Sequence, residues 1–333
     1  MVISLNAGHR GIWRLALAAA AVAALACGPA LAVEGGTGAY LLGSRDIYAG
    51  IVPMPGLYLG NDVIYINGRL DGLSVAGAVA TNVHLTAIVD KLSVTSSTPT
   101  RILGGRFAIS AQLPIVSMHG DFDLASPFVA LGLNDSQFGL GDLSVIPMLG
   151  YDYGNLHYNV SLPFFFPTGE YSDATAKRGP PVEVDILSLS KNRPGIDPTV
   201  GVTYLNPKNG IEVSGALGVT FSAPNNATDY QTAPELHFEG TVAQHFQDGL
   251  VLAATGYAYQ QLGNDSGSGA EQMQKVLGAD SLQARVFGVG PLIGYSTKVG
   301  DNLVSMKVKY IHEFGALRRI EGDVVWGNLT IGF

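Results

Sequence analysis

Apolar and polar residues alternate along many short segments of this chain. Between positions 156 and 166, Leu156, Tyr158 and Val160 face one way, whereas His157 and Asn159 face the other. A period of two residues indicates a β-strand, because successive side chains of a strand point to opposite faces. The same pattern recurs often enough to predict an all-β chain of about twelve strands. The predicted strands are 57–66, 77–92, 103–117, 140–152, 156–166, 197–205, 211–221, 235–246, 250–262, 282–298, 303–314 and 324–333.

The connections between these segments alternate in length. Tight hairpin signals, rich in Gly, Asn and Asp, occur at 153–155, 206–210, 247–249 and 299–302. Long polar connections are expected at 118–139, 167–196, 222–234, 263–281 and 315–323. Residues 93–102, rich in Ser and Thr, are expected as one longer connection on the side of the short turns. Short turns on one side and long loops on the other are typical of outer-membrane barrels.

The composition favours lipid, rather than a second sheet, as the cover of the apolar faces. Apolar residues make up 47% of the chain and charged residues only 14%, whereas soluble domains carry about 25% charged residues. Unpaired backbone amides in hydrocarbon cost several kcal/mol each, so strands in a membrane must close on themselves. We therefore predict an antiparallel transmembrane β-barrel over residues 57–333, in contact with outer-membrane lipid. A net charge of −8 gives no basic face for nucleic acid.

The first 32 residues have the pattern of a cleaved secretory signal peptide. Arg10 and Arg14 precede an apolar run from Leu15 to Ala26, and small residues flank a cleavage site after Ala32. The alternative is an uncleaved membrane anchor. Cleavage leaves 301 residues and removes Cys27, the single cysteine, so the mature chain has neither disulfides nor thiolate chemistry. The expected location is the bacterial outer membrane.

Residues 33–56 precede the first predicted strand and carry little periodicity. Twelve strands enclose a lumen between the filled eight-stranded barrels and the open sixteen-stranded porins. Because this stretch is apolar and glycine-rich, we expect it to fold into the lumen as a plug. The alternative is a disordered periplasmic tail. The candidate plug residues are Tyr40, Arg45, Asp46, Tyr48 and Met54.

Charged residues on the inward face of the strands are candidates for lining the lumen. They are Arg106, Asp142, Asp152, Glu212, Glu235, His237, Glu239, Arg285, Lys307, Lys309 and Glu313. Opposite charges across a narrow lumen would pair and fix its shape; alternatively, they form a selectivity filter. The sequence leaves both interpretations open.

The last strand ends the chain on an aromatic residue. Val325, Gly327, Leu329, Ile331 and Phe333 share one face. A terminal phenylalanine that closes an alternating strand resembles the insertion signal read by the barrel assembly machinery of Gram-negative bacteria. The alternative is a last strand that simply ends on a core phenylalanine.

An outer-membrane hydrolase acting on lipids or esters is the enzymatic alternative. Glu235, His237, Glu239 and His245 lie on one strand face, but no serine string resembles a nucleophile turn. Same-face neighbours on a strand are about 7 Å apart, so one strand cannot close a tetrahedral metal site. We therefore expect no enzyme, no catalytic residue, no metal and no cofactor.

Several strings of the mature chain resemble one known family. They include 34–40, 42–46, 49–51, 53–56, 139–142, 167–171, 206–214, 229–230, 238–240, 257–261, 263–267 and 285–295. These strings resemble the family named for the MetA-pathway of phenol degradation, also called SphA-like transporters. Residues 187–194, in the third long loop, depart from the family pattern. The resemblance implies a channel or transporter for small hydrophobic or aromatic compounds. A structural or adhesive barrel without transport is the alternative, and the oligomeric state stays open.

Overall fold

A computed structural model describes residues 37–333 except 71–72, 76–77, 127–128, 173–174, 178–182, 186 and 278. The expected signal peptide and residues 33–36 of the expected plug lie outside the described residues. None of the helices in the described part of the chain is long and apolar enough to cross a membrane.

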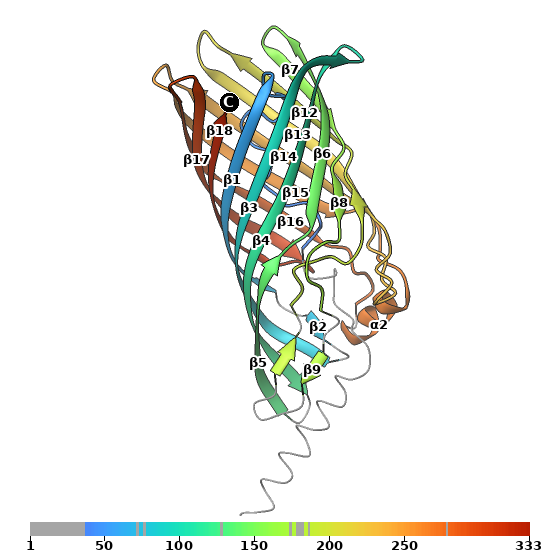
Figure 1. Cartoon of the computed structure of the whole chain (residues 1–333). Coiled ribbons are helices and arrows are strands. Elements are labelled where there is room, and N and C mark those ends of the chain that lie inside the picture. Colours follow the sequence, from blue (N-terminus) through green and yellow to red (C-terminus); the bar gives the residue numbers. More distant parts are fainter. Residues whose placement is uncertain are drawn as a thin grey trace, which may run out of the picture.

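Among the described residues, twelve antiparallel strands form a closed barrel (Figure 1). They are β1 (Gly56–Leu70), β3 (Ala78–Ile102), β4 (Gly105–Ser126), β6 (Leu143–Tyr153), β7 (Leu156–Ser161), β12 (Thr199–Asn206), β13 (Ile211–Ser222), β14 (Glu235–His245), β15 (Leu250–Gln261), β16 (Arg285–Val299), β17 (Asn302–Leu317) and β18 (Glu321–Gly332). Each pairs with the next, and β18 closes the ring on β1, with Tyr58 opposite Gly332 and Arg69 opposite Glu321. The prediction of a barrel of about twelve strands is confirmed.

Three of the barrel strands are interrupted where the ladder cannot continue. β4 pairs with β6 along its first part and with β5 (Val129–Leu140) along its second, and the chain bends between β5 and β6 at Gly141. β8 (Phe164–Phe166) continues β7 beyond Pro163, and β11 (Gly195–Ile196) precedes β12 across Pro198. Proline has no N–H to donate to a neighbouring strand, so the breaks at Pro163 and Pro198 follow from the sequence.

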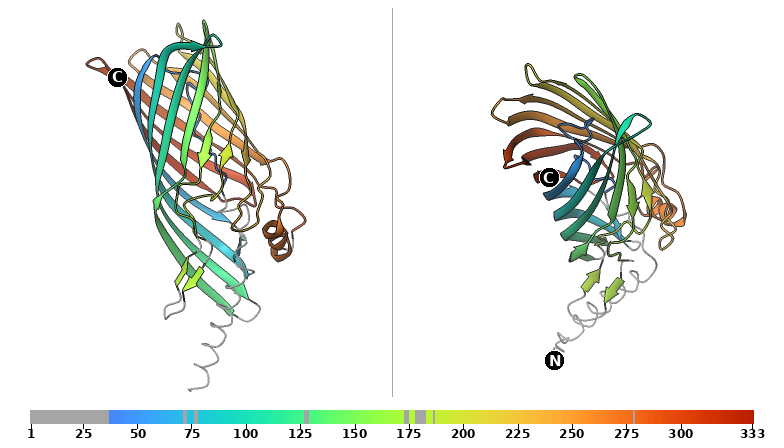
Figure 2. Two further views of the ribbon diagram at one scale, coloured as in Figure 1. Left: turned by 45° about the vertical axis from the view of Figure 1, so that its right-hand side comes forward. Right: turned by 45° about the horizontal axis from the view of Figure 1, so that its top comes forward.

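The two ends of the barrel differ. The tight turns and the C-terminus lie at one end, whereas β5, α2 (Ser268–Leu277) and the long connections lie at the other (Figures 1 and 2). At this second end β2 (Leu73–Val75) pairs with β3, and β9 (Thr175–Lys177) pairs with β10 (Glu183–Asp185). The predicted separation of short turns from long loops is therefore present in the fold.

The barrel is apolar outside and polar inside. Along β13 the outward Val213 and Leu217 are half exposed, whereas the intervening Glu212 and Ser214 are buried in the interior. The same alternation runs through β12, β14 and β16. An exposed apolar face around a closed barrel is what hydrocarbon covers, because every backbone group in the wall is paired within the sheet.

Three predicted connections are wrong in their extent. Residues 93–102 belong to β3, where Ser93, Thr95 and Ser97 point inward and alternate with outward residues. Residues 118–139 are largely strand, because β4 runs to Ser126 and β5 begins at Val129. The expected connection at 315–323 shrinks to 318–320. In each case the backbone hydrogen bonds between neighbouring strands continue beyond the residues that alternate between apolar and polar.

Candidate functional site in the barrel lumen

Residues 37–56, called here the luminal segment, run through the interior of the barrel and end at the first residue of β1. The segment follows β14: Gly38 lies beside Glu235, Tyr40 stacks on His237, and further residues reach Glu239. β14 runs from the long-loop end to the short-turn end, and the segment passes along the lumen in the same direction (Figure 1). Its polar groups are hydrogen-bonded to β3, β4, β7, β12, β13, β14 and β17.

Glu239 is the main acceptor for the middle of the segment. It is 1% exposed. Its carboxylate accepts hydrogen bonds from the backbone N–H of Gly43 at 2.6 Å and of Arg45 at 2.5 Å, and from the hydroxyl of Tyr40 at 3.3 Å. A buried carboxylate requires several donors to offset its lost hydration. The luminal segment supplies three of them.

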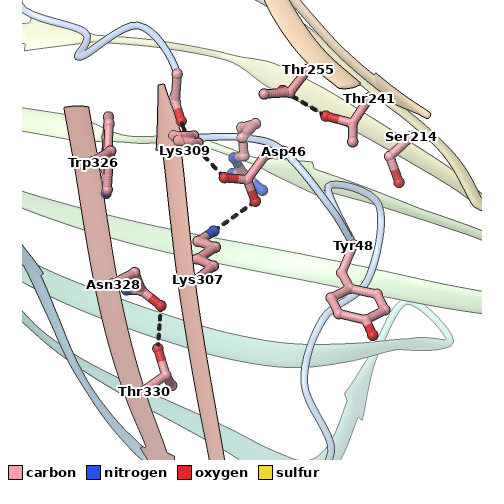
Figure 3. A network of polar contacts seen from close by, with 12 residues as sticks. Asp46, Tyr48, Ser214, Thr241, Thr255, Lys307, Lys309, Trp326, Asn328 and Thr330 are labelled. Carbon is pink, nitrogen blue, oxygen red and sulfur yellow. Dashed lines mark hydrogen bonds and ion pairs between the residues drawn. The ribbon is translucent and has the colours of Figure 1, made fainter. Parts of the chain in front are cut away.

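Asp46 forms a double ion pair with two lysines of β17 (Figure 3). Its carboxylate oxygens lie 2.6 Å from the Lys307 Nζ and 2.8 Å from the Lys309 Nζ. Lys309 also donates to the carbonyl oxygen of Gly43 and lies over the Trp326 ring, 4.2 Å from its centroid. Asp46 and Lys309 are both buried. Because removal of either charge would leave the other one buried and unpaired, this contact holds the segment strongly.

Tyr48 anchors the segment near the short-turn end. Its backbone N–H donates to Glu212 at 2.5 Å, and its hydroxyl lies 3.1 Å from His245 Nδ1. The other ring nitrogen of His245 is 2.5 Å from Glu212, which also accepts from the Ser214 hydroxyl. Tyr48 has a φ of 63°, a left-handed conformation that a residue with a side chain adopts only when its surroundings hold it there.

The last part of the luminal segment lies close to the barrel wall. Gly50 donates its N–H to Thr203 at 2.8 Å, and Asn159 donates to the carbonyl of Ala49 at 2.8 Å. A Cβ on Gly50 would lie 2.4 Å from the backbone nitrogen of Thr203. Only glycine permits this close approach. Arg106 then donates to the carbonyl of Val52 at 2.8 Å, and the chain enters β1.

His237 and Asp197 form a buried pair behind Tyr40. His237 Nε2 lies 3.0 Å from Asp197 Oδ2, and Thr199 and Thr220 also donate to this carboxylate. The Tyr40 ring is stacked on the imidazole, with centroids 3.8 Å apart and planes 15° apart. The pair has an orienting acid and a base, but no serine or other nucleophile is hydrogen-bonded to His237 among the described contacts.

An apolar cluster lies beside this polar surface. Ile64, Tyr257, Val286 and Trp326 belong to a buried cluster contributed by neighbouring strands. Leu42 of the luminal segment is part of the cluster, and Tyr40 and Leu41 pack against it. The lumen therefore places aliphatic and aromatic side chains next to carboxylates: Tyr257 is the ladder partner of Glu239, and Trp326 donates to Asp62.

Most predicted lining residues face the interior. Glu212, Glu235, His237, Glu239, Lys309 and Glu313 are buried there, Lys307 contacts Asp46, and Arg106 and Asp152 pair at 3.1 Å near the short-turn end. The prediction is wrong for Arg285, which is exposed on the outward face of β16 beside a register shift in its pairing with β17. Asp142 lies at the bend before β6, where it accepts from the backbone N–H groups of Gly169 and Lys191.

Four of the five candidate plug residues contact the barrel wall. Tyr40, Arg45, Asp46 and Tyr48 contact the barrel wall, and Arg45 donates to Ser161 at 2.8 Å. Met54 is 65% exposed, so its side chain does not contribute to the interior.

The predicted insertion signal lies at the C-terminus. Val325, Leu329 and Phe333 are exposed on the outward face of the last strand, with Gly327 and Ile331 partly covered. Phe333 also exchanges backbone hydrogen bonds with Leu57.

Several luminal residues are not among those predicted from the sequence. Asp62 accepts from Trp326 Nε1 at 2.7 Å and lies 3.5 Å from Lys91 Nζ, all three being buried. Asp62 and Lys91 lie within predicted strands, so the alternation that found the other charges could have found them. Asp197 begins the predicted strand 197–205 and shares its buried face with Thr199 and Thr203, so the same alternation could have found it.

Comparisons with known proteins agree with the barrel. The model of the family described as "Putative MetA-pathway of phenol degradation" matches residues 70–329. Among curated proteins, none matches the chain significantly. An outer membrane channel from Pseudomonas putida F1 is similar in structure, with a TM-score of 0.62 and 14% identity, over 86% of this chain and 98% of that one.

Weaker structural likenesses extend to other outer-membrane barrels. The translocator domain of the autotransporter NalP from Neisseria meningitidis has 12% identity and a TM-score of 0.42, over 84% of this chain and 89% of that one. The NanC porin has 9% identity and a TM-score of 0.40, over 83% and 98%. At these scores the two likenesses carry no conclusion about function.

Proposed function

Because the chain belongs to the family described as "Putative MetA-pathway of phenol degradation", we propose that it is an outer-membrane channel for small hydrophobic or aromatic compounds, plugged by residues 33–56. In this proposal the signal peptide exports the chain, and the strand ending at Phe333 directs it to the assembly machinery. The barrel wall then provides the path across the membrane, and the luminal segment controls that path.

The observation that carries the proposal is the set of contacts of the luminal segment. Its residues bind to both the β12–β14 side and the β17 side of the wall, through Glu239 and Tyr48 on one side and Asp46 on the other. A disordered tail would leave these buried wall carboxylates and lysines without partners, at a cost of several kcal/mol. This supports a plug rather than a tail.

The same contacts favour a structural role for the inward charges. Glu212, Glu239, Lys307 and Lys309 each bind the luminal segment directly. We infer that they hold the plug in place, and that they do not form a filter for ions along an open pore. Movement of the segment would release both acidic and basic groups, so the released lumen would keep a mixed charge.

The substrate class is supported by the mixed lining of the lumen. A small aromatic compound has an apolar ring, which suits the cluster around Trp326 and Tyr257, and often a polar substituent, which suits the carboxylates beside that cluster. The apolar part of the lining cannot replace the water of a strongly hydrated ion. This favours hydrophobic and aromatic cargo.

Uptake of labelled aromatic acids and of a neutral labelled aromatic compound, by cells with and without the protein, tests the proposal. We expect faster uptake with the protein, and equal rates would overturn it. A hydrolytic function would instead appear as cleavage of a chromogenic ester by the purified barrel, abolished by His237→Ala. No such cleavage is expected, since no nucleophile is hydrogen-bonded to His237 among the described contacts and Tyr40 covers its ring.

A further inference from the structure

Tyr40 is the only residue of the luminal segment whose aromatic ring is stacked on a wall side chain and hydrogen-bonded through its hydroxyl to a buried carboxylate, among the described contacts. We propose that the seat of this ring is a binding site for phenols, and that a phenol entering the lumen competes with Tyr40 for it. Tyr40 is then an internal ligand that the transported compound replaces. The proposal rests on the proposed function only for how the phenol reaches the lumen.

The seat matches both parts of a phenol. The ring lies face to face on the His237 imidazole, with centroids 3.8 Å apart. The hydroxyl donates to Glu239 at 3.3 Å. A phenol has an ordinary pKa of about 10 and is a neutral donor at pH 7, so it suits a carboxylate acceptor. A benzene ring without the hydroxyl would leave this part of the Glu239 carboxylate unused.

The imidazole that forms the floor of the seat is held rigidly. His237 and Asp197 are both buried, and Asp197 in turn accepts hydrogen bonds from Thr199 and Thr220. Gly218 is paired with His237 across β13 and β14, and a Cβ there would lie 2.4 Å from His237 Nε2. Such support fixes the orientation of a side chain that contacts a ligand.

A second observation indicates that this surface is made for a ligand. The buried Nδ1 of His237 has no hydrogen-bond partner among the described residues, and the side chain is 1% exposed. Buried polar atoms normally have partners, and one without a partner requires an explanation. A ring nitrogen without a hydrogen-bond partner, beside a stacked aromatic ring, suits a ligand with a polar substituent.

The 3.3 Å length of the Tyr40 hydrogen bond makes competition feasible. The segment also binds Glu239 through two backbone N–H groups at 2.6 Å and 2.5 Å, so the Tyr40 hydroxyl is the weakest of the three donors. A free phenol is not tied to a backbone and can optimise both the stack and the hydrogen bond. Replacing Tyr40 would therefore loosen the adjoining part of the segment first.

Binding of 4-methylphenol, which is the tyrosine side chain without its backbone, tests the proposal. In Tyr40→Ala the seat is empty, so we expect tighter binding of 4-methylphenol than in the wild type, observed by saturation-transfer NMR. Toluene lacks the hydroxyl and should bind Tyr40→Ala about 10- to 100-fold more weakly than 4-methylphenol, as expected for a lost hydrogen bond to a charged group. Tyr40→Phe keeps the ring in place and should not gain affinity.

Tyr204→Ala is the matched control, because Tyr204 lies on the outward face of β12. Its affinity for 4-methylphenol should equal that of the wild type, which also corrects for partition into detergent. Equal binding to Tyr40→Ala and Tyr204→Ala, or equal binding of toluene and 4-methylphenol, would overturn the site.

A second measurement uses the wild-type seat and does not depend on the folding of Tyr40→Ala. The mature chain contains no cysteine, and Ala49 is 5% exposed in the lumen. In Ala49→Cys, 4-methylphenol should speed the reaction with a thiol reagent more than toluene does. Equal rates with both compounds would overturn the competition. Binding without cellular uptake would overturn the proposed function alone, whereas uptake without binding would overturn this site alone.

Discussion

Replacing Asp46 by asparagine should release the luminal segment without damaging the barrel. The change removes the carboxylate that pairs with Lys307 at 2.6 Å and with Lys309 at 2.8 Å. The Lys309 ammonium group is buried, and breaking a buried ion pair by removing one partner costs about 3–5 kcal/mol. That corresponds to an increase of about two to three and a half orders of magnitude in the ratio of released to seated segment.

The reaction of Ala49→Cys with a thiol reagent measures this ratio, because a residue buried in the seated form reacts through the released form. Asp46→Asn should therefore speed the labelling by about the same factor. Asp301→Asn is the matched control, since Asp301 is exposed in the turn between β16 and β17. Lys309→Met should act more strongly than Lys307→Met, because Lys307 is partly exposed. Unchanged labelling in Asp46→Asn would refute the reasoning.

Three further changes follow from the same structure. Glu239→Gln should speed labelling of Ala49→Cys about tenfold or more, because three donors lose a charged acceptor, whereas the exposed Glu271→Gln should not. Burial lowers the pKa of the Lys191 ammonium group from 10.5 to about 8, so the folded state binds fewer protons than the unfolded state between these values. The melting temperature should therefore rise with pH from about 8 to 10.5, relative to Lys191→Met, and the difference should be level below pH 8. Deleting Phe333 should lower the amount of assembled barrel in cells but not its refolding in detergent, and equal loss in both would contradict a role as an assembly signal.

The barrel could be predicted from sequence because hydrocarbon imposes a rule on every strand. Outward residues such as Val213 and Leu217 must be apolar at membrane depth, which produces the period of two. The rule ends where the strands leave the membrane. β4 and β5 continue beyond it with polar outward residues such as His119 and Asp121, so residues 118–139 resemble a loop in sequence although they form paired strands.

The candidate site was predictable where alternation holds and not elsewhere. Glu239 and Lys309 follow the inward face of regular strands. Arg285 shares the outward face of β16 with Phe287 and Val289, so the alternation along this strand, correctly applied, places it outside the lumen. The contacts of Asp46 and Tyr48 join positions more than 150 residues apart, and no local pattern encodes which strand a segment without periodicity will touch.

Single-channel recording of the chain without residues 33–52, beside the full-length mature chain, tests the central claim most directly. If the luminal segment controls the path through the barrel, the shortened chain should show a larger conductance in planar bilayers and remain a folded barrel on gels. Equal conductance of the two folded proteins would contradict a plug in the lumen.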